Sequence, residues 1–167
     1  RIFAANYRNG ENREYGLCIM GDASVEEGYV LGALGFAGHS KHRLPILFVC
    51  EDNDLSVLTK KNVRREWECT TIVDGFGIKA VEIADDPWTI MHYVKELEND
   101  LPAFINVHLT RILRHVGSKS DGPPEWDRFE LVKKELERIG LKSEVDEIER
   151  KTKKDIDELW KKKLEEY

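Results

Sequence analysis

Two apolar runs in this chain each end in a polar corner, and a helix-forming segment lies between them. Residues 15–20 lead directly into Gly-Asp-Ala-Ser at 21–24, and residues 45–50 lead into Glu-Asp-Asn-Asp at 51–54. Short apolar runs of this kind predict buried strands, and a helical connection between two strands predicts a parallel pair. Because the carboxyl ends of parallel strands meet at one edge of a sheet, where α/β proteins bind ligands, we expect the two corners to lie side by side.

The same alternation of strands and helices continues along the chain. We expect strands at residues 15–20, 45–50, 78–83 and 103–109, helices at 26–40 and 87–99, and a short helix or loop at 59–67. Asp86 and Pro87 are suited to begin the second helix, as its N-cap and its first helical residue. Strands that alternate with helices predict the α/β class, here a parallel sheet flanked by helices.

The last quarter of the chain has a different composition, with many charges and few large apolar residues. It predicts helices at 126–139 and 144–165, separated by a break that begins at Gly140. We therefore expect two parts: an α/β domain at residues 1–124 and a C-terminal helical hairpin at residues 125–167. Residues 1–7 resemble the last turns of a helix, so we expect the α/β domain to be incomplete at its N-terminus.

The composition also narrows the function classes. The 167 residues are 41% hydrophobic, which is sufficient for a core, and the formal net charge of -6 argues against nucleic acid as the main partner. No apolar run approaches the roughly 20 residues of a membrane span, and the first residues lack the apolar stretch of a signal peptide. Three cysteines, at 18, 50 and 69, are expected to be free thiols of a cytoplasmic protein.

The polar corners carry the chemistry. Gly21 permits a sharp turn after the strand, so that Asp22 projects from the strand end, and Asn53 occupies the neighbouring corner. A carboxylate and an amide oxygen suit a hard divalent cation such as Mg²⁺, which also takes ligands from phosphate and water. The backbone amides of Ala23 and Ser24, expected at the start of a helix, favour an anion. The corners therefore predict a metal–phosphate site.

The chain resembles the C-terminal half of the α subunit of thiamine-diphosphate-dependent 2-oxoacid dehydrogenases and related two-chain enzymes. The family's Gly-Asp-Gly and Asn-Asn motifs correspond to Gly21-Asp22-Ala23 and Asp52-Asn53, with Asp22 and Asn53 31 positions apart. The resemblance covers nearly the whole chain. The downstream segments that follow the family's order are Gly-Phe-Gly-Ile at 75–78, Asp-Asp-Pro at 85–87, Pro-Ala-Phe-Ile at 102–105 and Ser-Lys-Ser-Asp at 118–121.

The resemblance implies a cofactor and assigns residues to it. Its fold would be the thiamine-diphosphate-binding fold, and the cofactors would be thiamine diphosphate and Mg²⁺. The metal ligands would be the side chains of Asp22 and Asn53 and the backbone carbonyl of Leu55. The residues around the cofactor would be Gly21, Asp22, Ala23, Ser24, Asn53, Leu55 and His115. His115 would have a catalytic role, in a loop with Ser118 and Asp121 over the cofactor entrance.

The resemblance also implies partners. In the two-chain family a β-type subunit supplies the glutamate that activates the cofactor, so we expect a hetero-oligomer with a β-type subunit. A separate N-terminal α fragment is a further expected partner. We expect no nucleic acid partner and no membrane association.

Three departures from the family pattern leave the activity open. Ala23 replaces a glycine, Asp52 replaces the first asparagine, and Gly117 stands where the dehydrogenases carry a second histidine. The first hypothesis is a subunit of a 2-oxoacid dehydrogenase or decarboxylase. The second is a transketolase-like enzyme or one from a sugar or natural-product pathway. The third is a non-catalytic, truncated or assembly subunit.

Overall fold

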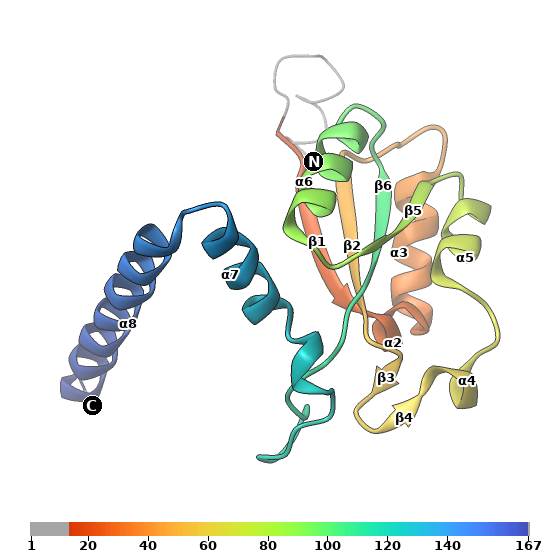
Figure 1. Cartoon of the computed structure of the whole chain (residues 1–167). Helices are drawn as coiled ribbons and strands as arrows, with labels where there is room; N and C mark the ends of the chain where they lie inside the picture. Colours follow the sequence, from red (N-terminus) through yellow and green to blue (C-terminus); the bar gives the residue numbers. More distant parts are fainter. Residues whose placement is uncertain (1–13, 167) are drawn as a thin grey trace. The chain divides into compact units, whose positions relative to one another are not determined.

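The computed structural model describes residues 14–166, in two compact units divided between Gly122 and Pro123. The first unit contains a four-stranded sheet in the order β1-β2-β6-β5, and every neighbouring pair is parallel (Figure 1). Its strands are β1 (Gly16–Gly21), β2 (Ile46–Asp52), β5 (Lys79–Ala84) and β6 (Ala103–His108). These are the four predicted strands, so the predicted α/β class is confirmed. The helical turns expected at residues 1–7 lie outside the described residues.

Helices cover both faces of the sheet (Figure 1). On one face, α3 (Gly28–Gly38) and α5 (Cys69–Gly75) bury Leu34, Val73 and their neighbours against β2 and β6. On the other face, α6 (Pro87–Leu97) packs with Leu97 against Leu47 and Ile105. Because β2 and β6 are central and covered on both sides, their sequences before the carboxyl ends are apolar without alternation, except at Asn106.

The prediction of a single helix at residues 26–40 is wrong at the N-terminal end. The structure has a one-turn helix, α2 (Asp22–Val25), followed by a break and then α3. At the break, Glu27 is extended, with φ −75° and ψ 131°. This arrangement places Val25 in the core and leaves the Glu26 carboxylate to pair with two arginines. Buried packing and ion pairing therefore override the continuous helical pattern.

The segment between β2 and β5 contains more structure than the predicted short helix or loop. It forms a small antiparallel hairpin of β3 (Leu55–Ser56) and β4 (Thr59–Lys60), followed by α4 (Lys61–Arg64) and α5. Two residues of the hairpin region have positive φ: Asp54 at 61° and Val57 at 54°. The hairpin lies just beyond the carboxyl end of β2 (Figure 1).

Helix α6 begins as predicted. The Asp86 carboxylate accepts a hydrogen bond from the Thr89 amide at 2.9 Å, and Pro87 is the first helical residue. This cap satisfies an amide that has no acceptor inside the helix.

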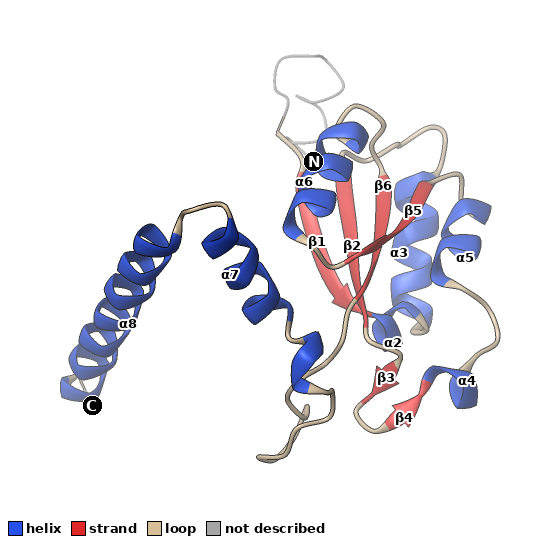
Figure 2. Cartoon of the chain, viewed as in Figure 1, coloured by secondary structure: helices blue, strands red, loops and turns tan. Residues whose placement is uncertain are grey.

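The second unit consists of a 3-10 turn at Pro124–Trp126, helix α7 (Arg128–Arg138) and helix α8 (Lys142–Glu165), drawn in Figure 2. The break between the helices falls at Gly140, whose φ of 88° is easily adopted only by glycine. An ion pair between Lys133 and Glu149, 2.9 Å long, joins the two helices near the break. The predicted helix pair is thus present. Among the described residues, no helix combines the length and apolarity that a membrane crossing needs.

Candidate cofactor and metal site

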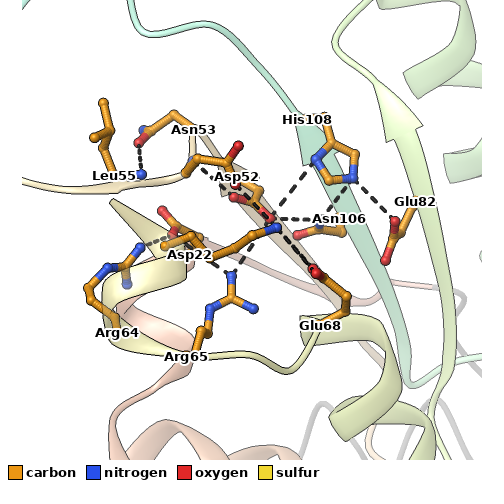
Figure 3. Close-up of polar contacts among 12 residues, drawn as sticks. Asp22, Asp52, Asn53, Leu55, Arg64, Arg65, Glu68, Glu82, Asn106 and His108 are labelled. Carbon is orange, nitrogen blue, oxygen red and sulfur yellow. Dashed lines mark hydrogen bonds and ion pairs between the residues drawn. The ribbon is translucent and has the colours of Figure 1, made fainter. Parts of the chain in front are cut away.

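The register of the sheet brings the two polar corners together. Gly21 at the end of β1 is the Cα partner of Glu51 in β2, so Asp22 follows one strand beside the point where Asp52 ends the other. The Nη2 atom of Arg65 lies 3.9 Å from Asp22 Oδ2 and 3.8 Å from Asp52 Oδ2. Figure 3 shows dashed lines from this one guanidinium to the carboxylates of both Asp22 and Asp52. The expectation that parallel strand ends would place the corners side by side is met by this geometry.

Asp22 is 1% exposed, and its carboxylate is neutralised by arginine. Arg64 Nη2 donates to Asp22 Oδ2 at 2.6 Å, and the same guanidinium pairs with Glu26. Burial raises the pKa of Asp22 above its ordinary value, Arg64 lowers it, and the Asp52 carboxylate raises it again, so that the net direction is upward. Binding of a cation to this carboxylate would offset part of the hydration free energy that the carboxylate loses on burial.

The two arginines are themselves tightly held but not fully satisfied. Arg65 Nη1 donates to the backbone oxygen of Trp67 at 2.6 Å, its Nε donates to Glu26, and its guanidinium lies 4.8 Å from the Trp67 ring centre. Arg64 Nε and Arg65 Nη2 are buried donors without a hydrogen-bond acceptor among the described residues. Buried polar groups normally have partners, so unsatisfied donors beside a buried carboxylate fit a site that accepts an additional charged group.

Asp52, one of the departures from the family pattern, is bound by the protein. Its Oδ1 accepts from the Asp54 amide at 3.1 Å, and its Oδ2 accepts from Asn106 Nδ2, also at 3.1 Å. Asn106 lies in β6 and is fully buried, and its Oδ1 has no hydrogen-bond partner within residues 14–166. Asp52 therefore stabilises the corner through its hydrogen bond from Asn106 and its attraction to Arg65.

Asn53 and Leu55, the other two expected metal ligands, lie beside a surface pocket. Asn53 Oδ1 accepts from the Leu55 amide at 3.1 Å, which leaves the amide oxygen one further lone pair. The residues lining the pocket are Asn53, Asp54, Leu55, Lys60, Lys61 and Asn62. Lys61 pairs with Asp54 at 3.2 Å and with Glu68 at 3.1 Å. Partial burial has the largest single effect on the pKa of Lys61 and lowers it, but the pairing with Glu68 and Asp54 together outweighs burial and raises the pKa. Lys60 and Lys61 thus line the same pocket as Asn53 and give it the positive charge that a phosphate would require.

The donor set at this edge fits a Mg²⁺–diphosphate group. It offers a buried carboxylate at Asp22, an amide oxygen at Asn53 and lysine ammonium groups around the pocket. Across residues 14–166, no three His, Cys, Asp or Glu side chains converge as a metal cage. Besides the single carboxylate of Asp22, a cation here would accordingly depend on amide, carbonyl, phosphate and water oxygens, which is the usual coordination of Mg²⁺.

Gly21, Ala23 and Ser24 lie where the first corner turns. Gly21 is the N-cap of α2, and Ala23 and Ser24 are in its first turn, where amides have no acceptor inside the helix. These amides belong to α2, so the expectation that they open the long helix is wrong in that respect. Their expected contact with a diphosphate stays a prediction.

His115 lies in an exposed loop that is anchored near the second corner. Asp121 accepts from Arg111 Nε at 2.8 Å and from Arg114 Nε at 3.2 Å, which closes the loop on itself. Arg111 Nη2 also donates to the Val57 oxygen, at 2.6 Å, and so ties the loop to the β3–β4 hairpin. The described contacts do not join His115 to Asp22 or Asn53, so its catalytic role stays a prediction.

Several residues of the site were not predicted from the sequence. Arg64 and Arg65 come from a polar segment about 40 residues after Asp22, and no local pattern indicates which carboxylate they meet. Asn106 could have been found, because a polar residue inside an otherwise apolar predicted strand indicates a specific buried contact. A row of polar contacts continues from it: His108 Nε2 lies 3.3 Å from Glu82 Oε2 (Figure 3). Glu82 Oε1 in turn accepts from Thr70 Oγ1 at 2.5 Å.

Comparisons with solved structures agree with the fold. A transketolase from Leishmania mexicana matches with a TM-score of 0.54 and 20% identity, over 64% of this chain and 17% of that chain. Transketolases from Campylobacter jejuni (0.52, 18%, 57% and 15%) and Pichia stipitis (0.53, 23%, 65% and 17%) match similarly. The chain therefore spans about a sixth of the length of these proteins. No curated protein matches the chain.

The parallel sheet and its flanking helices match the fold of these transketolases. The family model described as the dehydrogenase E1 component matches residues 2–166. The chain belongs to the dehydrogenase E1 component family, a family of thiamine-diphosphate-dependent enzymes.

Proposed function

We propose that this chain is a subunit of a thiamine-diphosphate-dependent 2-oxoacid dehydrogenase or decarboxylase and holds the Mg²⁺–diphosphate end of the cofactor. The observation that carries the proposal is the meeting of Asp22 and the Asn53 corner at the carboxyl edge of the sheet, beside a lysine-lined pocket. The family match supports the class of enzyme.

In this proposal the side chains of Asp22 and Asn53 and the carbonyl of Leu55 hold Mg²⁺. The amides of Ala23 and Ser24, with Lys60 and Lys61, would hold the diphosphate. When bound, the cofactor supplies the carbanion chemistry, and the protein supplies position and electrostatics. In the free chain burial raises the pKa of Asp22 and the hydrogen bond from Arg64 lowers it, and a cation bound at Asp22 Oδ2 would compete with Arg64 for that oxygen.

The activity depends on partner chains. We propose a cytoplasmic hetero-oligomer in which a β-type subunit supplies the activating glutamate, with a separate N-terminal α fragment as a further partner. His115 is the proposed catalytic side chain of this chain, at the entrance to the site. The exposed loop and its tie to Val57 support that position, because they place the loop next to the hairpin that follows Asn53.

Two other functions have specific support. Ketol transfer of the transketolase kind is favoured by the structural matches, which are all to transketolases among the proteins compared above. A non-catalytic assembly role is favoured by Arg64 and Arg65, since their guanidinium groups supply positive charge to Asp22 and Asp52, as a metal ion would. Binding of thiamine diphosphate distinguishes the two enzyme functions from the assembly role. Assays with a 2-oxoacid and, separately, with a ketose phosphate distinguish the two enzyme functions from each other.

Calorimetry tests the proposal. The chain, assembled with its partner subunits, is titrated with thiamine diphosphate in the presence of Mg²⁺ and again with a chelator. We expect binding that requires the metal. The absence of binding to the correctly assembled complex would contradict both enzyme functions and leave the assembly role.

Binding of Mg²⁺ should depend on pH through Asp22. Because the pKa of Asp22 is raised above 3.8, its carboxylate takes up a proton at a higher pH than an ordinary aspartate does. Below that raised pKa the metal must displace the proton, so affinity should fall by about tenfold per pH unit. The free chain, by the same linkage, is stabilised as pH falls and loses that contribution as pH rises through the raised pKa. Thermal-shift measurements with and without Mg²⁺ across pH check both signs; a metal-induced shift that does not change with pH would contradict the role of Asp22.

A further inference from the structure

The distal half of α8 exposes large apolar side chains. Ile156, Leu159, Trp160 and Leu164 are 49%, 57%, 65% and 71% exposed. They recur every three or four residues, so they lie along one side of the helix. Apolar residues gathered on one side of a helix indicate a surface that is covered by another helix.

Helix α7 is too short to cover this surface. At 1.5 Å per residue, α7 is about 16 Å long and α8 about 36 Å. The half-buried residues of α8, Val145 and Glu149, are near its beginning, where Glu149 pairs with Lys133 of α7. Residues 150–166 are all exposed. The second half of α8 therefore extends beyond its neighbour within the unit.

In this half of α8, charged blocks at equal distances on the two sides of Leu159 and Trp160 have opposite signs. Moving outward in either direction from this centre, the first charged block on the N-terminal side is acidic and the first on the C-terminal side is basic. The next block on each side reverses the sign. The blocks are Lys151, Lys153 and Lys154; Asp155, Asp157 and Glu158; Lys161, Lys162 and Lys163; and Glu165 and Glu166.

We propose that α8 pairs with α8 of a second copy of this chain, in antiparallel orientation, with Leu159 and Trp160 at the centre. In this arrangement the acidic block 155–158 of one helix lies level with the basic block 161–163 of the other. The basic block 151–154 likewise lies level with 165–166. A parallel pair would place like charges level with one another, so the charge pattern selects both the partner and its orientation.

Contacts within the helix explain only part of the pattern. Lys151 pairs with Asp155 at 3.0 Å and Lys163 with Glu166 at 2.6 Å. Such pairs along one helix account for neighbouring opposite charges. They do not account for the exposed Leu159 and Trp160 at the centre of the antisymmetric pattern. About four helical turns bury less than the roughly 800 Å² per partner of a standard interface, so the association is weak and depends on protein concentration.

Sedimentation equilibrium of the full chain over a concentration series tests the pairing. The wild-type mass should rise towards twice that of the monomer. L159A/W160A should weaken self-association at least tenfold, and K134E, an exposed change on α7, should leave it unchanged. Circular dichroism shows whether each variant keeps its helices. A wild-type chain that stays monomeric, or an L159A/W160A variant that associates normally, would overturn the proposal.

Two charge variants test the orientation. K161E/K162E/K163E makes every charged position of residues 155–166 acidic, and D155K/D157K/E158K makes every charged position of residues 151–163 basic. Each variant should remain monomeric alone because level blocks then repel. An equimolar mixture should associate, because every acidic block then meets a basic one. If these charges formed contacts only within one helix, mixing the two variants would not restore association. A mixture that stays monomeric would therefore rule out the antiparallel pair.

Discussion

Replacing Asp22 with asparagine should reduce Mg²⁺-dependent binding of thiamine diphosphate at least a hundredfold in the assembled complex. Asparagine has nearly the same size and keeps one oxygen, but it lacks the negative charge that a hard divalent cation requires. Calorimetry measures the loss. The buried position of Asp22 makes the effect large, because water cannot replace a missing ligand freely.

The variant should remain folded, which keeps the result interpretable. Arg64 retains its pairing with Glu26 when the Asp22 carboxylate is removed. Asp74→Asn, an exposed aspartate at the end of α5, is the matched control and should bind the cofactor normally. Undiminished affinity in Asp22→Asn would show that Asp22 is not a metal ligand.

Replacing Gly38 with alanine should destabilise the α/β unit by about 3 kcal/mol or more. The added Cβ would lie 2.3 Å from the backbone oxygen of Phe76 and 2.8 Å from Ile78 Cγ1. A backbone oxygen cannot rotate away as the end of a side chain can, so the end of α3 and the segment before β5 must separate. Urea unfolding followed by circular dichroism measures the change in free energy.

Gly32→Ala is the matched control in the same helix. Apart from the adjacent residues and the backbone of α3 itself, no atom of residues 14–166 lies within 4 Å of the Cβ position at Gly32. Alanine in a helix interior is favoured over glycine by about 0.5–1 kcal/mol, so this variant should be slightly more stable than the wild type. Equal stability of Gly38→Ala and Gly32→Ala would contradict the close packing of α3 against residues 76–78.

The sequence was sufficient for the sheet because the relevant information is local. Continuous apolar runs give β2 and β6, and Asp86 with Pro87 gives the start of α6. The meeting of Asp22 with the Asn53 corner follows from one general property, the shared edge of parallel strands. These predictions need no knowledge of which distant side chains touch.

The remaining features depend on contacts between distant segments. The break before α3 exists because Val25 is buried and Glu26 meets Arg64 and Arg65, and neither cause is visible in residues 22–38. The role of Asp52 was likewise hidden, since its partner Asn106 is 54 residues away. A sequence pattern can indicate that a charge is present but not which opposite charge compensates it.

Arg65 has a consequence for the interpretation of any substitution at this edge of the sheet. Its guanidinium is shared among Asp22, Asp52 and Glu26, which come from the ends of two strands and the turn before α3. When one of the three carboxylates is removed, the arginine can interact more strongly with the other two. The effects of single substitutions here will therefore not add, and only double-mutant cycles can apportion the energy among the three carboxylates.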